Sequence, residues 1–184
     1  MNTWLRRPLH SVHVPHNKNT KEMPTVDMPI PQRVSIQMQQ HIGPPGIPSV
    51  KKGDSVLLGQ VIADNPAPLG TPIHASVSGT VLEIEEIRPP RGPNCQSIVI
   101  ESDGEQKKHP SFIPHSVDSR EEFIAAVRSS GMVGLGGAGF PTYIKYNPRN
   151  LSQVDTLIIN ATECEPYITA NYRSMLQQGE ELLD

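Results

Sequence analysis

The chain has 184 residues, with 16 lysines and arginines against 19 aspartates and glutamates, and a formal net charge of −3 at pH 7. This balance gives no support for nucleic-acid binding, which usually needs a basic excess, and no apolar run reaches the roughly 18 residues of a membrane span. The 19 prolines and an aromatic content of only 4% favour short strands and turns over a helical bundle. The two cysteines, Cys95 and Cys164, form no C-x-x-C pair, so we expect a reducing, cytosolic setting without a disulfide framework.

Residues 1–48 predict an irregular segment that packs on the rest of the chain, because they are rich in proline, histidine and asparagine. Only residues 33–38 have the pattern of a strand. The histidines at positions 10, 13, 16 and 41 are scattered, without paired ligand spacing, and no metal site is predicted.

A repeated strand–turn pattern begins near residue 50. Residues 50–63 contain Gly53-Asp54 and Gly59-Gln60, and residues 73–84 contain Ser78-Gly79-Thr80-Val81, each between apolar strands. Residues 96–101 add a further strand. The pattern resembles the barrel-sandwich hybrid fold of lipoyl and biotinyl domains, which we assign to residues 49–113. The connection 64–71, where a carrier lysine would stand, contains none, so we expect the fold without a swinging arm.

A helix is predicted over residues 119–130. Ser119 and Glu122 form a potential capping box, and Gly131 is suited to the C-cap. The apolar face of this helix consists of Phe123, Ile124 and Val127.

The most informative segment is the glycine-rich loop of residues 131–146. A nearly bare backbone can turn sharply and place its N–H groups against a phosphate. Pro141 suits the first turn of a helix, and Lys145 follows one turn later with a positive charge. A helix rather than a strand precedes the loop, which argues against an ordinary Rossmann fingerprint. We predict a phosphate cradle between two helices, formed by Gly134, Gly136, Gly137 and Gly139.

Residues 114–184 are interpreted as the beginning of a Rossmann-like α/β domain. Val154, Leu157, Ile158 and Ile159 predict a strand over 153–160 that is buried on both faces. A helix over 169–184 follows, with packing residues Tyr172, Met175, Leu176, Leu182 and Leu183. Its abrupt end indicates a piece of a longer protein. Ligands are expected where the strand ends.

At that point the sequence reads Asn160-Ala-Thr-Glu-Cys-Glu-Pro-Tyr167. The amide of Asn160 could hydrogen-bond a planar heterocycle, and Glu163 and Glu165 could bind ribose hydroxyls or a nicotinamide amide. The alternative is a solvated acidic turn that caps the following helix, and the octamer alone leaves both open. Because no base adjoins Cys164, we expect it to be a small buried residue and not a nucleophile.

Together, residues 134–145 and 160–166 are similar to the flavin-binding signatures of the NADH-oxidising subunit of respiratory complex I. The resemblance to the RnfC family, a component of the Rnf electron-transport complex, extends further. It also covers residues 13–18, residues 39–43 and the barrel-sandwich half.

The resemblance implies an NADH dehydrogenase-type subunit. NADH would deliver a hydride to FMN, and electrons would leave singly through 4Fe–4S clusters, coupling NAD and ferredoxin to ion movement. Other subunits of the complex would be partners and would hold the protein peripherally on the cytoplasmic face of the bacterial inner membrane. No catalytic side chain is assigned. The implied cofactor contacts are Gly134, Gly136, Gly137, Gly139 and Lys145 along the FMN, Asn160 on the flavin, and Glu163 and Glu165 near flavin and nicotinamide.

The family's two C-x-x-C-x-x-C-x-x-x-C-P cluster motifs have no counterpart in this sequence. We therefore expect this chain alone neither to pass electrons nor to hold FMN tightly. Two alternatives stay open: a corrin reductase of bacterial microcompartments, and a non-catalytic docking module of a redox complex. Activity with cobalamin or with ferredoxin would distinguish the first, and the intact glycine loop with Lys145 and Asn160 argues against the second.

Overall fold

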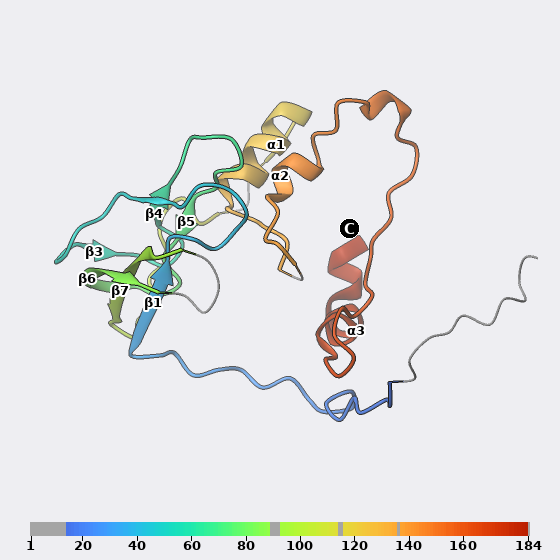
Figure 1. The fold of residues 1–184 in the computed structure, drawn as a ribbon, viewed down its shortest axis with the longest axis horizontal. Coiled ribbons are helices and arrows are strands. Elements are labelled where there is room, and N and C mark those ends of the chain that lie inside the picture. Colours follow the sequence, from blue (N-terminus) through green and yellow to red (C-terminus); the bar gives the residue numbers. More distant parts are fainter. Residues whose placement is uncertain (1–13, 89–92, 114–115, 136, 184) are drawn as a thin grey trace, which may run out of the picture. The chain divides into compact units, whose positions relative to one another are not determined.

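A computed structural model describes residues 14–88, 93–113, 116–135 and 137–183 (Figure 1). The chain divides into two compact units. One is Met28–Asp155, and the other joins the two ends of the chain, described here for residues 14–27 and 156–183.

The first unit contains two antiparallel sheets. The four-stranded sheet has the order β1 (Arg33–Gln37), β7 (Cys95–Ser102), β6 (Gly79–Ile87), β3 (Ser55–Val56). The three-stranded sheet has the order β2 (Ile47–Pro48), β4 (Val61–Asp64), β5 (Ile73–His74). The strands predicted from the repeated pattern are therefore confirmed, and the barrel-sandwich fold with them. β1 and β2, from the segment expected to be irregular, belong to these same sheets.

The core of this unit is formed by side chains from both sheets. β7 is the most buried strand because β1 and β6 flank it, with Ile98 and Ile100 fully buried. β6 begins at Gly79, where φ is +154° and a Cβ would lie 1.9 Å from the Glu101 carbonyl oxygen, so only glycine fits. The remaining core side chains are Ile36, Met38, Val56, Ile62, Ala63, Ile73, Ala75, Val77 and Val81.

Two helices follow the barrel in the same unit. α1 (Arg120–Ser129) begins with Ser119, whose Oγ accepts the Glu122 N–H at 3.2 Å. The Glu122 carboxylate accepts the N–H of Asp118 at 2.8 Å, one residue earlier than a capping box requires. α2 (Thr142–Lys145) is a single turn, and Pro141 is its N-cap instead of its first residue. A helix of one turn has little dipole, so Lys145 is the main positive charge here.

The predicted strand over residues 153–160 is wrong. Leu151–Gln153 form a short 3₁₀ helix, and residues 154–160, all within the described part of the chain, form neither strand nor helix. The side chains of Leu157 and Ile158 are 80% and 82% exposed. An apolar run forms a doubly buried strand only where neighbouring strands and helices cover it, and no described strand pairs with this run.

The predicted C-terminal helix is confirmed as α3 (Ala170–Leu183), which is interrupted at Gln178 by non-helical backbone angles. Its expected packing side chains Tyr172, Met175 and Leu176 are 38%, 40% and 60% exposed. The side chains of Leu182 and Leu183 lie outside the described residues. No helix within the described ranges is long and apolar enough to cross a bilayer.

Candidate functional site

The glycine loop is closed at its base like a hairpin. Val133 and Pro141 form an antiparallel bridge, and the Gly134 N–H donates to the Phe140 carbonyl oxygen at 3.0 Å. The tip is open to solvent, with Leu135 95% exposed. The loop lies between α1 and α2, as the sequence predicted.

The side chain of Lys145 folds back over this loop. A Cβ on Gly134 would lie 3.0 Å from Lys145 Nζ, and a Cβ on Gly137 would meet nothing within 4 Å. The ammonium group therefore lies beside bare, accessible backbone, which is the arrangement that recognises a phosphate. Gly136, the fourth predicted cradle glycine, lies outside the described residues.

The barrel holds the glycine loop at both ends. Gly131 has φ +69°, and a Cβ there would lie 2.4 Å from the Pro72 carbonyl oxygen. Gly139 has φ +65°, and a Cβ there would lie 2.8 Å from His41 Cα and 3.0 Å from the Gln40 carbonyl oxygen. Both positions need glycine for two reasons, the left-handed backbone and the close approach of another backbone.

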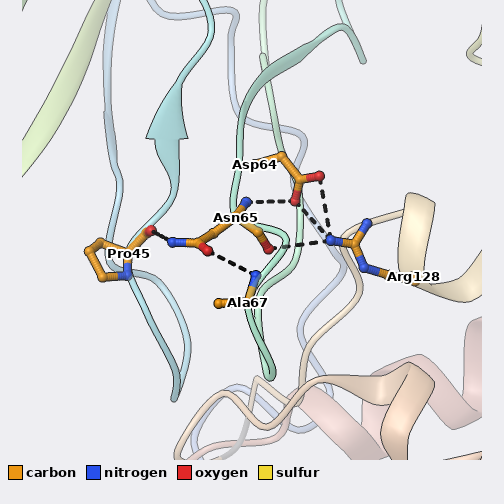
Figure 2. Close-up of polar contacts among 5 residues, drawn as sticks. All are labelled: Pro45, Asp64, Asn65, Ala67 and Arg128. Atoms are coloured by element: carbon orange, nitrogen blue, oxygen red, sulfur yellow. Dashed lines mark hydrogen bonds and ion pairs between the residues drawn. The ribbon is translucent and has the colours of Figure 1, made fainter.

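A third contact fixes α1 to the barrel (Figure 2). Nη2 of Arg128, in the last turn of α1, lies 3.2 Å and 3.4 Å from the carboxylate oxygens of Asp64 and 3.3 Å from the Asn65 carbonyl oxygen. Asn65 Nδ2 in turn donates to the Pro45 carbonyl oxygen at 2.8 Å, and its Oδ1 accepts the Ala67 N–H at 3.0 Å. The connection that would carry a lysine in a carrier domain here anchors the helix before the glycine loop.

A small polar cavity of about 110 Å³ lies where barrel and loop meet, lined in part by His41, Thr71, His74 and Gly131. His41 is 5% exposed, and its Nε2 has no hydrogen-bond partner within the described part of the chain. Burial lowers the pKa of His74 below its usual 6.5, opposed by a hydrogen bond to the backbone of Ser129 and by the charge of Asp64. We expect His74 to be neutral at pH 7.

The acidic turn, residues 160–166, belongs to the other unit. Asn160 Oδ1 accepts the Thr162 N–H at 3.0 Å, which closes a local turn. Glu163 Oε1 accepts the Tyr172 N–H in the first turn of α3 at 3.0 Å. The capping interpretation therefore holds for this oxygen, while Glu163 Oε2 is buried without a partner among the described residues. Glu165 is exposed, and Cys164 is exposed too, contrary to the expectation of burial, because the turn lies at the surface.

The predicted site residues thus fall into two groups, one in each unit. The glycine loop contributes Gly134, Gly137, Gly139 and Lys145, and the acidic turn contributes Asn160, Glu163 and Glu165. Sequence reasoning missed the residues that support the loop. The left-handed Gly131 and Gly139 were a signal that another backbone approaches, but nothing in the pattern identified that backbone as Pro72 and His41.

Comparison with known proteins gives two family matches. Residues 9–105 match the RnfC Barrel sandwich hybrid domain, and residues 127–184 match the Nuo51 FMN-binding domain. The chain is 42% identical over 170 residues to the C subunit of the proton-translocating ferredoxin:NAD(+) oxidoreductase complex of Clostridium ljungdahlii, and the match covers 90% of this chain and 37% of that protein.

Two further relatives are similar over nearly the whole chain. The C subunit of the Na(+)-translocating ferredoxin:NAD(+) oxidoreductase complex of Acetobacterium woodii is 41% identical over 176 residues, covering 94% of this chain and 40% of that protein. The C subunit of the ion-translocating oxidoreductase complex of Rhodobacter capsulatus is 41% identical over 174 residues, covering 92% of this chain and 33% of that protein. The chain spans two fifths or less of the length of these curated relatives.

Proposed function

The chain belongs to the RnfC family, and on that premise we propose that it is the N-terminal part of a subunit that exchanges electrons between NAD(H) and FMN. Electrons then pass to 4Fe–4S clusters held outside these residues, and NADH–ferredoxin electron transfer is coupled to ion transport. The subunit sits peripherally on the cytoplasmic face of the bacterial inner membrane, bound to the other subunits of its complex. The observation that carries the proposal is the Lys145 ammonium group beside bare backbone, within a segment that matches an FMN-binding domain.

The residues of the glycine loop fit the phosphate end of FMN. Lys145 provides a full charge, and the open backbone at Gly137 leaves room for a bulky anion. Gly139 and Gly131 hold the loop against the barrel, so its conformation is set before a ligand binds. A preformed loop loses little conformational freedom on binding.

The acidic turn supplies the groups for the polar edges of flavin and nicotinamide. Asn160 and Glu165 present an amide and a carboxylate from the surface of the turn, and Glu163 Oε2 is an acceptor without a partner among the described residues. Carboxylates accept hydrogen bonds from ribose hydroxyls and from a carboxamide. When bound, FMN supplies hydride acceptance and one-electron release, and these protein groups position it.

An anaerobic NADH titration of the full-length protein, followed through the flavin absorbance band, tests this function. We expect NADH to bleach the band in the wild type and in Lys52→Met, a control lysine on an exposed turn of the barrel. Lys145→Met should weaken FMN binding about tenfold, because a hydrogen bond to a charged group contributes roughly 1.5–3 kcal/mol. A wild-type protein whose flavin does not respond to NADH contradicts the proposal.

A further inference from the structure

Residues 18–25, which we call the arm, are bound to the C-terminal part of the chain within the same unit. Three hydrogen bonds connect residues about 150 positions apart. They join Lys18 Nζ to the Ile168 carbonyl oxygen at 2.8 Å, the hydroxyls of Thr20 and Thr169 at 2.8 Å, and Thr25 Oγ1 to Gln177 Oε1 at 2.9 Å.

The contacts of the arm concentrate at the beginning of α3. Thr169 directly precedes the helix, is 6% exposed, and its carbonyl oxygen accepts the Arg173 N–H at 2.9 Å. Lys21 Nζ lies 5.3 Å from the ring centroid of Tyr172, at cation–π distance. The arm therefore holds the residues with which the helix starts.

The acidic turn is attached to the same residues. Its Glu163 accepts the Tyr172 N–H at 3.0 Å, and Asn171 Nδ2 donates to the Thr162 carbonyl oxygen at 3.1 Å. The beginning of α3 is thus the common support of the arm and the turn. A change in the arm's grip on that support displaces the carboxylates of the turn.

Lys18 also brings a charge to this place. It donates to the carbonyl of Ile168, three residues beyond Glu165. Three residues span at most about 11 Å, roughly one Debye length at physiological salt. The ammonium group offsets part of the mutual repulsion of Glu163 and Glu165, which favours keeping both ionised in one turn.

We propose that the arm positions the acidic turn for binding of a nicotinamide nucleotide, with Lys18 and Thr20 as positioning residues. This rests on the proposed function, which gives the turn its ligand class. It also gives a role to the stretch around residues 13–18, which carries part of the family resemblance and lies far in sequence from both cofactor motifs.

The experiment compares Lys18→Met with Lys18→Arg and with the control Lys52→Met in the full-length protein. One readout is deuterium uptake by peptides that cover residues 162–172, and the other is NADH affinity. We expect Lys18→Met to speed exchange about tenfold and to weaken NADH binding about fivefold, the loss of one partly exposed charged hydrogen bond. Arginine, which can still donate to the Ile168 carbonyl, should restore both, and Lys52→Met should change neither.

Thr20→Val removes one hydrogen bond while keeping the shape of the side chain, and it replaces Lys18→Met if that variant does not fold. Unchanged exchange in the variants overturns the inference, whether or not flavin is bound. Faster exchange with unchanged NADH affinity overturns it too, because the arm would then order the turn without serving nucleotide binding. A wild-type protein that binds no NADH contradicts the proposed function itself, and is seen before any variant is compared.

Discussion

The Cα atom of His41 occupies the space that a side chain on Gly139 would need, since a Cβ there would lie 2.8 Å from it. The backbone next to it adds a hydrogen bond, from the Ile42 N–H to the Ala138 carbonyl oxygen at 3.1 Å. At the other end of the loop the Pro72 carbonyl approaches Gly131 in the same way. The barrel therefore serves as a template on which the glycine loop takes its shape.

Replacing Gly139 with alanine should destabilise this unit. The left-handed backbone would cost alanine about 1–2 kcal/mol, and the new methyl group would displace backbone atoms that cannot rotate away. We expect the free energy of unfolding to fall by about 2 kcal/mol or more. Urea denaturation followed by circular dichroism measures it. Gly137→Ala is the matched control, expected within about 0.5 kcal/mol of wild type, and equal stability of both variants would contradict the template role.

The ion pair between Arg128 and Asp64 should contribute little by itself. The two side chains are 34% and 41% exposed, so solvent screens their attraction. A double-mutant cycle with Arg128→Ala and Asp64→Ala should give a coupling energy of about 0.5–1 kcal/mol. A coupling energy indistinguishable from zero would show that α1 is held by its packing alone.

The lowered pKa of His74 predicts a pH dependence of stability. Because burial favours the neutral imidazole in the folded protein, the unfolded chain binds more protons as the pH falls past 6.5. His74 therefore stabilises the fold above that pH and loses this contribution as the pH falls through its lower folded value. His74→Gln should flatten the stability difference between pH 7.5 and pH 5 in the same urea experiment. An unchanged slope would assign the pH dependence to other groups.

Glu163 separates helix capping from ligand binding. Glutamine at this position can still accept the Tyr172 N–H, so Glu163→Gln should keep α3 stable, whereas Glu163→Ala should cost about 1 kcal/mol as a lost cap. If the carboxylate binds the nucleotide, Glu163→Gln should nevertheless weaken NADH affinity severalfold. Amide exchange at Tyr172 and NADH titration report the two effects, and normal affinity in Glu163→Gln would leave Glu163 only its capping role.

The barrel could be predicted from sequence because its pattern is local. Glycine turns such as Gly53 and Gly79 and the alternation in β6 and β7 identify strands and their boundaries within a few residues. The predicted strand over 153–160 failed for the opposite reason. Apolar residues such as Leu157 and Ile158 indicate a tendency to be buried, but not the partner that would bury them.

The two cofactor motifs were visible in the sequence, and their supports were not. Lys145 follows its glycines by a few residues, so their relation can be inferred from spacing. Arg128 and Asp64 are 64 positions apart, and Lys18 and Ile168 are 150 apart. Such contacts depend on the whole chain path, and a single sequence contains no signal of them.

The most direct test of the central claim is the absorbance spectrum and FMN titration of this chain beside the full-length protein, both purified anaerobically. We predict bound flavin in the full-length protein and weak or no binding by residues 1–184 alone, because part of the site is expected beyond them. No flavin in either protein, with no FMN binding on titration, would contradict the redox function and leave a structural or docking role for this chain.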